Sequence, residues 1–274
     1  MSEPPAQRGN RPTMTELRAV AQPPTVLGRR NSEHWAGALY LRKGSIFLTR
    51  ALLPTGISAN GVTWLMIVIG VLGALVLMLP GWWPFLVCAV LIQLHIMVDC
   101  SDGEVARWRN QSGVAGVYID RVGHYIVEPL LPICFGIHLD GGITHAAGWT
   151  MLGMLTAILV LGKKAIGDLV HVARTYFGWP KMSEDAEVAA PRAGGLRSVR
   201  SVLRFFPFFR AFGAIEYSLI LFVLASVDAV LGLAGGSAEP EVLQWWMIIG
   251  VGLAAVTAGG YLLAILASNR LRRP

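Results

Sequence analysis

Residues 61–80, GVTWLMIVIGVLGALVLMLP, decide the fold of this chain. The stretch contains no charged side chain, and about 20 apolar residues are what a helix needs to cross the hydrocarbon core of a bilayer. The whole chain has the same character, because 54% of its 274 residues are hydrophobic and only 15% are charged. Soluble domains average about 25% charged residues. The sequence therefore predicts an all-α, polytopic integral membrane protein and excludes a soluble fold.

Five further apolar blocks follow this one, and basic residues alternate with them along the chain. Lys and Arg cluster before the first block, after the second, late in the fourth, before the fifth and at the C-terminal end, whereas the opposite links contain neither. Because basic loops stay in the cytoplasm, both termini are expected to be cytoplasmic. The predicted transmembrane spans are 61–80, 84–106, 116–138, 147–175, 208–233 and 243–268.

Two segments of different composition precede the first span. Residues 1–32 are rich in Pro, Arg and polar residues and lack the apolar core of a signal peptide, which is typical of a disordered cytoplasmic tail. Residues 33–57 alternate apolar and aromatic residues with basic ones. This pattern favours an amphipathic juxtamembrane helix on the membrane surface over an ordinary linker. Residues 58–270 are expected to form one six-helix membrane domain.

The formal net charge of +6 raises the question of a nucleic-acid partner. The basic residues follow the predicted membrane orientation, so they indicate contact with anionic membrane lipids and no nucleic-acid partner. Most of the 23 basic residues are Arg. Together with the Ala and Gly content, this favours a GC-rich bacterial coding sequence, so the expected location is a bacterial cell membrane.

Charged residues enter the apolar pattern at 99–124, DCSDGEVARWRNQSGVAGVYIDRVGH. Ionisable residues inside membrane spans are costly and indicate a functional site. Helical spacing places Asp99, Asp102 and Ala106 on one face of the second span, and it places Gly116, Asp120 and His124 on one face of the third. Antiparallel packing of the two spans would bring three carboxylates and an imidazole together.

Three neighbouring carboxylates repel one another unless a cation neutralises them, and oxygen ligands favour Mg²⁺ or Mn²⁺. Gly103 and Gly116 would let phosphates approach the helices, and Arg107 offers a fork that suits phosphate oxygens. The pattern therefore predicts a metal-dependent site for phosphate chemistry. A structural ion-pair cluster of Arg107 and Arg121 with the aspartates is the alternative.

These residues resemble the signature of the CDP-alcohol phosphotransferase family, in the pattern Asp99-x2-Asp102-Gly103-x2-Ala106-Arg107-x8-Gly116-x3-Asp120-x3. The last position of that signature is a fourth aspartate in the family, and His124 stands there in this chain. Before the first span, residues 59–63, ANGVT, are similar to the family's Pro-Asn-x-Val-Thr motif, with Ala59 in place of the proline.

The resemblance implies that a phosphatidyl group moves from a CDP-activated donor such as CDP-diacylglycerol to an acceptor hydroxyl, with release of CMP, in phospholipid biosynthesis. It also implies two divalent ions, a homodimer and a site that opens to the cytoplasm. Carried over by position, the metal ligands are Asp99, Asp102, Asp120 and His124. The CDP-binding residues are Asn60, Thr63, Gly103, Ala106, Arg107 and Gly116.

His124 replaces the acid that the family uses as general base and ligand of the second metal. An imidazole can take a proton from a hydroxyl near neutral pH and can also bind a divalent ion. Glu128 lies one helical turn further on and could hold the other ring nitrogen. We therefore predict a catalytic pair of His124 and Glu128. The alternatives are that His124 is only a metal ligand, or that catalysis has been lost.

Basic residues further along the chain are candidates for binding a phosphorylated acceptor or a lipid head group, although snorkelling at the membrane interface explains them equally well. They are Lys163, Lys164, Arg197, Arg200 and Arg204. The acceptor alcohol cannot be read from the sequence. A catalytically silent relative that binds CDP-lipid or metal as a sensor or partner subunit is the second hypothesis for function.

Overall fold

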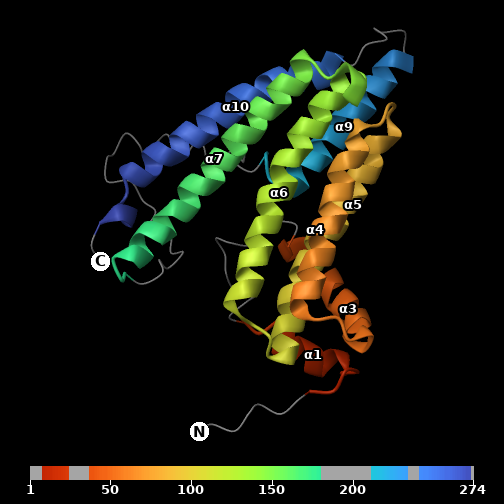
Figure 1. Cartoon of the computed structure of the whole chain (residues 1–274). Helices are drawn as coiled ribbons and strands as arrows, with labels where there is room; N and C mark the ends of the chain where they lie inside the picture. The colour runs from red at the N-terminus through yellow and green to blue at the C-terminus, as the bar shows by residue number, and fades with distance from the viewer. Residues whose placement is uncertain (1–7, 25–36, 180–210, 234–240, 273–274) are drawn as a thin grey trace. The chain divides into compact units, whose positions relative to one another are not determined.

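The computed structural model describes residues 8–24, 37–179, 211–233 and 241–272 (Figure 1). This described part contains helices and no strand, and it has six helices long and apolar enough to cross a membrane. The predicted all-α membrane protein with six spans is confirmed. The spanning helices are α4 (Ala59–Leu75, continued by the short helix η3, Val76–Met78), α5 (Trp83–Arg109), α6 (Val114–Leu139), α7 (Gly148–Tyr176), α9 (Ala214–Leu233) and α10 (Glu241–Leu266).

Most helix ends lie within a few residues of the positions expected from the sequence. The fifth span differs most, because the sequence places its start at 208 and α9 begins at Ala214. Residues 208–210 lie outside the described part, and residues 211–213 form a turn. Helix α7 has 29 residues. It is therefore as long as the sequence indicates.

A short helix, α1 (Met14–Ala21), lies within residues 1–32, for which the sequence analysis expected no fold. A capping box starts the helix, since the Thr13 N–H donates to Glu16 Oε2 at 2.8 Å and the Glu16 N–H donates to Thr13 Oγ1 at 3.3 Å. Leu17 and Ala21 have no exposed surface. The helix is thus stabilised by both its cap and the burial of its apolar face. Residues 1–7 and 25–32 lie outside the described part.

Between α1 and the first span, the chain forms a π-helical turn, η1 (Gly37–Leu41), then α3 (Arg42–Leu52) and a 3-10 turn, η2 (Leu53–Thr55). Helix α3 has two distinct faces. Ser45, Ile46 and Thr49 are buried, whereas Lys43 and Arg50 are exposed. The apolar Phe47 is also exposed on this helix, and the amphipathic juxtamembrane helix over 33–57 stays a prediction.

The chain divides into two compact units, of which the first comprises Met1–Leu72 and Val90–Ile126. Its apolar core combines α1, α3, the start of α4 and the end of α5. Asn110 ends α5 in the left-handed region, with φ 56°, which asparagine tolerates better than most residues. The Gln111 N–H then donates to the Ala106 carbonyl at 2.9 Å. This turn reverses the chain, so that α6 begins at Val114, four residues after Asn110.

The second unit comprises Gly73–Ala89 and Val127–Pro274. In it α7 and α10 lie side by side along much of their length, as Figure 1 shows in green and blue. Helices α6 and α7 approach so closely that a Cβ on Gly153 would lie 2.3 Å from the Pro132 carbonyl oxygen, and one on Gly136 would lie 2.5 Å from that of Trp149. Small residues allow such close packing of spanning helices.

Substitution of Gly153 by alanine should destabilise the second unit, because its Cβ would meet backbone atoms that cannot move aside. We expect a loss of about 1–3 kcal/mol or more in the free energy of unfolding. Thermal denaturation in detergent would show this as a lower midpoint. Gly162→Ala is the matched control on the same helix, since nothing lies within 4 Å of its Cβ position. Equal midpoints for the two variants would contradict the close packing of α6 and α7.

Asp140 organises the start of α7 from the preceding turn. Its carboxylate accepts hydrogen bonds from the N–H groups of Ala147, Trp149 and Thr150 and from the Thr150 hydroxyl, at 2.6–3.2 Å. Burial would raise the pKa of Asp140, but these bonds outweigh it and hold the pKa below its usual value. The carboxylate therefore supplies the cap that the N-cap residue itself, Ala147, lacks.

Removal of this cap by Asp140→Ala should cost about 1–2 kcal/mol of stability at neutral pH. Because the pKa of Asp140 is lowered in the folded protein, its stabilisation is present above the carboxyl's ordinary pKa and is lost as the pH falls through the folded value. Thermal midpoints of wild type and Asp140→Ala should therefore converge in acid. Asp140→Asn keeps one acceptor oxygen and should remove this pH dependence. A difference in thermal midpoint between wild type and Asp140→Ala that stays constant with pH would contradict the role of the Asp140 carboxylate as a cap.

Candidate active site

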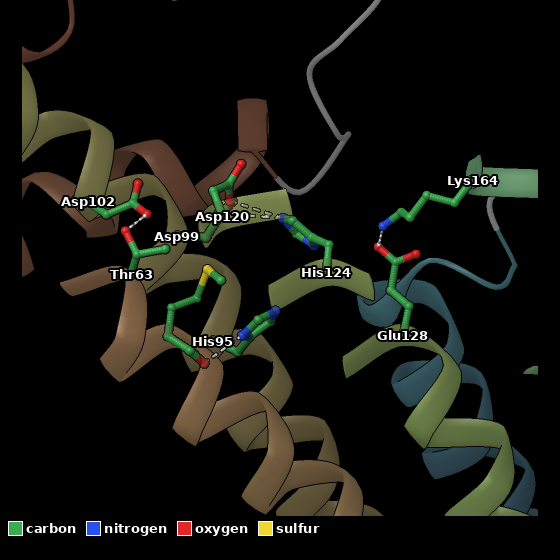
Figure 2. A network of polar contacts seen from close by, with 9 residues as sticks. Thr63, His95, Asp99, Asp102, Asp120, His124, Glu128 and Lys164 are labelled. Carbon is green, nitrogen blue, oxygen red and sulfur yellow. Dashed lines mark hydrogen bonds and ion pairs between the residues drawn. The ribbon is translucent and has the colours of Figure 1, made fainter. Parts of the chain in front are cut away.

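Two carboxylates and an imidazole meet where α5 and α6 lie together in the first unit (Figure 2). Asp99, on α5, and Asp120 and His124, on α6, each offer a ligand atom, and these atoms all lie within 4.8 Å of one another. His124 Nε2 is 3.5 Å from Asp99 Oδ1 and 3.6 Å from Asp120 Oδ1. The i, i+4 spacing on α6 puts Asp120 and His124 on one face, as the sequence predicts.

These three groups could hold a divalent ion. Both separations from His124 are at or beyond the limit of a hydrogen bond, so neither contact is a strong hydrogen bond. The side chains of Asp99, Asp120 and His124 are 27%, 37% and 24% exposed, and an ion can therefore reach them. Carboxylate oxygens with one imidazole nitrogen suit Mn²⁺ and related ions, and the oxygens alone suit Mg²⁺.

Asp102 lies outside that three-residue group, although the sequence places it on the same face of α5 as Asp99. Its Oδ2 accepts a hydrogen bond from the Thr63 hydroxyl at 2.7 Å. Thr63 comes from α4 and is only 2% exposed. This contact joins the entry motif of α4 to the acidic motif of α5. The role of Asp102 as a metal ligand stays a prediction.

A cavity of about 190 Å³ opens beside these residues in the first unit. Asp102 and Asp120 line it, together with all six residues that the family resemblance assigns to CDP: Asn60, Thr63, Gly103, Ala106, Arg107 and Gly116. The structure thus brings the predicted nucleotide residues into one pocket, from α4, α5 and α6. Their function in binding CDP stays a prediction.

Two of the pocket glycines, Gly103 and Gly116, make room for other side chains of the protein. A Cβ on Gly103 would lie 3.2 Å from Arg107 Nη1, and a Cβ on Gly116 would lie 3.2 Å from Asn60 Oδ1. The sequence analysis assigned this space to the phosphates of a ligand. In the structure the guanidinium of Arg107 and the amide of Asn60 lie there, and both also face the pocket.

Sequence reasoning missed the pocket residues outside the motif positions. The Gln111 amide oxygen accepts a hydrogen bond from the Ala59 N–H at 3.0 Å, which joins the α5–α6 link to the start of α4. This link joins the two halves of the acidic motif. Its position between them was the signal from which its residues could have been predicted to line the site. The pocket residues that were missed are Gln111, Ser112, Gly113 and Val117, whereas Ala59, which also lines the pocket, is the first position of the entry motif.

A second histidine lies next to His124. His95 is fully buried on α5, and its ring lies 5.9 Å from that of His124 in an edge-to-face arrangement. His95 Nδ1 is 2.8 Å from the Met66 carbonyl oxygen (Figure 2). His95 therefore links α5 to α4 and packs against the ring of His124.

Glu128 has a cationic partner in the second unit. Lys164 Nζ lies 2.6 Å from Glu128 Oε1, and this ion pair joins α6 to α7. The spacing of one helical turn predicts that Glu128 holds His124, and a carboxylate without a partner in a membrane span is costly. Lys164 supplies that compensation, so the pairing with His124 stays a prediction. Lys163, the neighbouring candidate for contact with a phosphorylated acceptor or a lipid head group, is partly buried. Arg197, Arg200 and Arg204 lie outside the described residues.

Residues 56–183 match the model of a protein family described as CDP-alcohol phosphatidyltransferase. This part of the chain belongs to that family. The resemblance seen in the sequence is thereby confirmed. The family consists of phosphotransferases that transfer a phosphoalcohol group from a CDP-alcohol. The match covers α4 to α7 and every pocket residue named above. No curated protein matches the chain.

Loss of a ligand side chain should weaken metal binding by this site. We expect the dissociation constant for Mn²⁺ to rise about tenfold or more in Asp120→Ala and in His124→Ala, since loss even of a group that only supports a ligand costs about 10–100-fold. Titration calorimetry on the protein in nanodiscs measures this without any turnover. His145→Ala is the control, because His145 lies in an exposed turn. Unchanged affinity in His124→Ala would remove His124 from the ligand set.

Proposed function

We propose that the protein transfers the phosphatidyl group of CDP-diacylglycerol to an acceptor hydroxyl, releases CMP and thereby serves phospholipid biosynthesis. The observation that carries this proposal is the pocket in which the six CDP residues meet two of the aspartates. The Asp99, Asp120 and His124 group adjoins it on the same two helices. A pocket for a nucleotide beside a cluster of possible metal ligands is what phosphoryl transfer needs, because this chemistry depends on positioning and charge stabilisation.

The proposed roles follow the places of the side chains. Arg107 lines the pocket and offers a fork for the diphosphate oxygens. Asn60 and Thr63 line the pocket from α4, and we propose that they contact the nucleotide. Asp99, Asp102 and Asp120 are the proposed ligands of two ions, Mg²⁺ or Mn²⁺, and His124 joins them in the alternative in which it is a metal ligand and not the base. Such ions, when bound, neutralise the diphosphate and the charge that develops on departing CMP.

His124 is proposed to take the proton of the acceptor hydroxyl as that oxygen attacks the phosphatidyl phosphorus and the bond to the CMP oxygen breaks. An imidazole is suited to this because its ordinary pKa lies near neutral pH. Glu128 lies four residues further along α6. We propose that it orients the ring of His124, and that Lys164 neutralises the Glu128 carboxylate from α7.

The location of the protein, its oligomeric state and its lipid contacts complete the proposal. The Arg, Ala and Gly content favours a bacterial cell membrane protein, and the distribution of basic residues favours a cytoplasmic position for both termini and the active site. A homodimer is proposed from the family resemblance. Lys163, Lys164, Arg197, Arg200 and Arg204 are the candidates for contact with a phosphorylated acceptor or a lipid head group.

A catalytically silent relative that binds CDP-lipid or metal is the second candidate function. The observation that favours it is His124, which stands where the family signature has its fourth aspartate. Such a protein would keep the pocket and the ligand group described above, because neither depends on turnover. The two candidates therefore differ in CMP release and agree in binding.

CMP release from CDP-diacylglycerol separates these candidates. The assay uses the protein in nanodiscs with Mg²⁺ or Mn²⁺ and a pool of alcohol and phospho-alcohol acceptors, with Asp99→Ala as the blank. We expect release above the blank, a new lipid identified by its mass, and a turnover about 100-fold lower in His124→Ala. Glu128→Gln should lower turnover in wild type and have no further effect in His124→Ala.

The outcomes of this assay have distinct meanings. Binding of CDP-lipid without CMP release would favour the silent relative. Wild-type turnover in His124→Ala would contradict its role as the base, and an effect of Glu128→Gln that persists in His124→Ala would show that Glu128 does not act through His124. His145→Ala should behave as wild type.

A further inference from the structure

The N-terminal helix α1 contacts the arginine of the nucleotide pocket. Arg107 Nε donates a hydrogen bond to the Ala21 carbonyl oxygen at 2.6 Å. Arg107 lines the cavity, and its guanidinium lies against Gly103, whose Cβ position is 3.2 Å from Nη1. The side chain is therefore held from two directions. One is the glycine on its own helix and the other is a backbone group more than eighty residues earlier in the chain.

The hydrogen bond from Arg107 is made at the C-terminal end of α1, where backbone carbonyls need a donor from outside the helix. Ala21 is the last residue of the helix, and the last carbonyls of a helix have no partner within it. The helix ends where Gln22 leaves the helical conformation, at φ −127° and ψ 58°, while its backbone N–H still donates to the Arg18 carbonyl at 3.0 Å. A cation is favourable at this end of a helix. Arg107 therefore satisfies the end of α1, and α1 in turn fixes the position of Arg107.

A buried carboxylate anchors the same helix end. Glu104 has no exposed surface, and it lies on α5 three residues before Arg107. It accepts hydrogen bonds from Gln22 Nε2 at 2.7 Å, from the Ser45 hydroxyl at 2.6 Å and from the Thr49 hydroxyl at 2.7 Å. A buried carboxylate is costly without such donors. The network therefore fixes where Gln22, and with it the carbonyl of Ala21, can lie.

The beginning of the segment is anchored on the end of α5 as well. Arg8 Nη1 donates to the carbonyl oxygens of Arg107 and Trp108 at 3.1 and 3.0 Å, and its guanidinium lies 5.6 Å from the centre of the Trp108 ring. The Trp108 indole N–H donates to the Gly9 carbonyl at 3.0 Å. Leu17 and Ala21 complete the attachment by joining the apolar core that contains Trp108.

We infer that residues 8–22 are a positioning element of the nucleotide pocket, in which Gln22, through Glu104 and the end of α1, holds the guanidinium of Arg107 ready for the phosphates of a nucleoside diphosphate. This inference rests on the proposed function, which assigns the phosphates to Arg107. A mobile arginine side chain loses rotamer entropy when it binds a ligand. Fixing the side chain beforehand removes that cost from binding.

The test is equilibrium binding of CDP to the full-length protein in nanodiscs at a fixed concentration of Mg²⁺. Gln22→Ala should raise the dissociation constant for CDP about tenfold, the loss expected when a hydrogen bond to a charged group is weakened. Gln22→Met, which keeps the length of the side chain without its amide, should do the same. In turnover assays the KM for CDP-diacylglycerol should rise while kcat stays near wild type.

Two comparisons separate positioning from stability. Thr15→Ala, at an exposed site on α1, should bind CDP as wild type does. If Gln22 acts through Arg107, then Gln22→Ala should have no further effect on CDP affinity in an Arg107→Ala background. Additive effects of the two substitutions would overturn the inference. So would a Gln22→Ala variant with a lower thermal midpoint and wild-type CDP affinity.

Failure of this inference can be told from failure of the proposed function. If wild type binds CDP and releases CMP, while Gln22→Ala and Gln22→Met retain wild-type affinity, only the positioning role is overturned. If wild type neither binds CDP nor releases CMP, the proposed function is overturned and the positioning role with it.

Discussion

The reversal of the chain between α5 and α6 is the constraint on which the site depends. The acidic motif is split between these two helices, and its halves can meet only if the helices run antiparallel from a short turn. Asn110 in the left-handed conformation ends α5. Gln111 then ties the turn to the start of α4 through the Ala59 N–H. These contacts place Asp120 and His124 opposite Asp99.

Much of the architecture could be predicted because it follows from local periodicity. Apolar blocks of sufficient length give spanning helices regardless of how the helices pack. Spacings of three and four residues give shared faces, which is why Asp120 and His124 could be placed together on α6. The rigid geometry of a helix converts sequence distance into spatial proximity, and no tertiary information is needed for that step.

Contacts that depend on partners distant in the chain could not be predicted in this way. The partner of Glu128 is Lys164, which approaches from another helix, and i, i+4 spacing could suggest only His124. The Arg107 contact involves the backbone carbonyl of Ala21. Every residue has such a carbonyl, so the sequence does not indicate which one forms the contact. The capping box of α1 was readable in Thr13 and Glu16, but the Pro and Arg content of the region favoured disorder.

The acidic residues of these apolar helices differ in how their charge is compensated, and this difference supports the assignment of the site. Glu104 is fully buried and is surrounded by neutral donors, which gives it a structural role. Glu128 has a lysine at 2.6 Å. Asp99 and Asp120 lie with a histidine at distances too long for strong hydrogen bonds, and they are partly exposed. Since carboxylates so placed repel one another, this group gains most from a divalent cation. Glu104 and Glu128, which have compensation from the protein itself, would gain least.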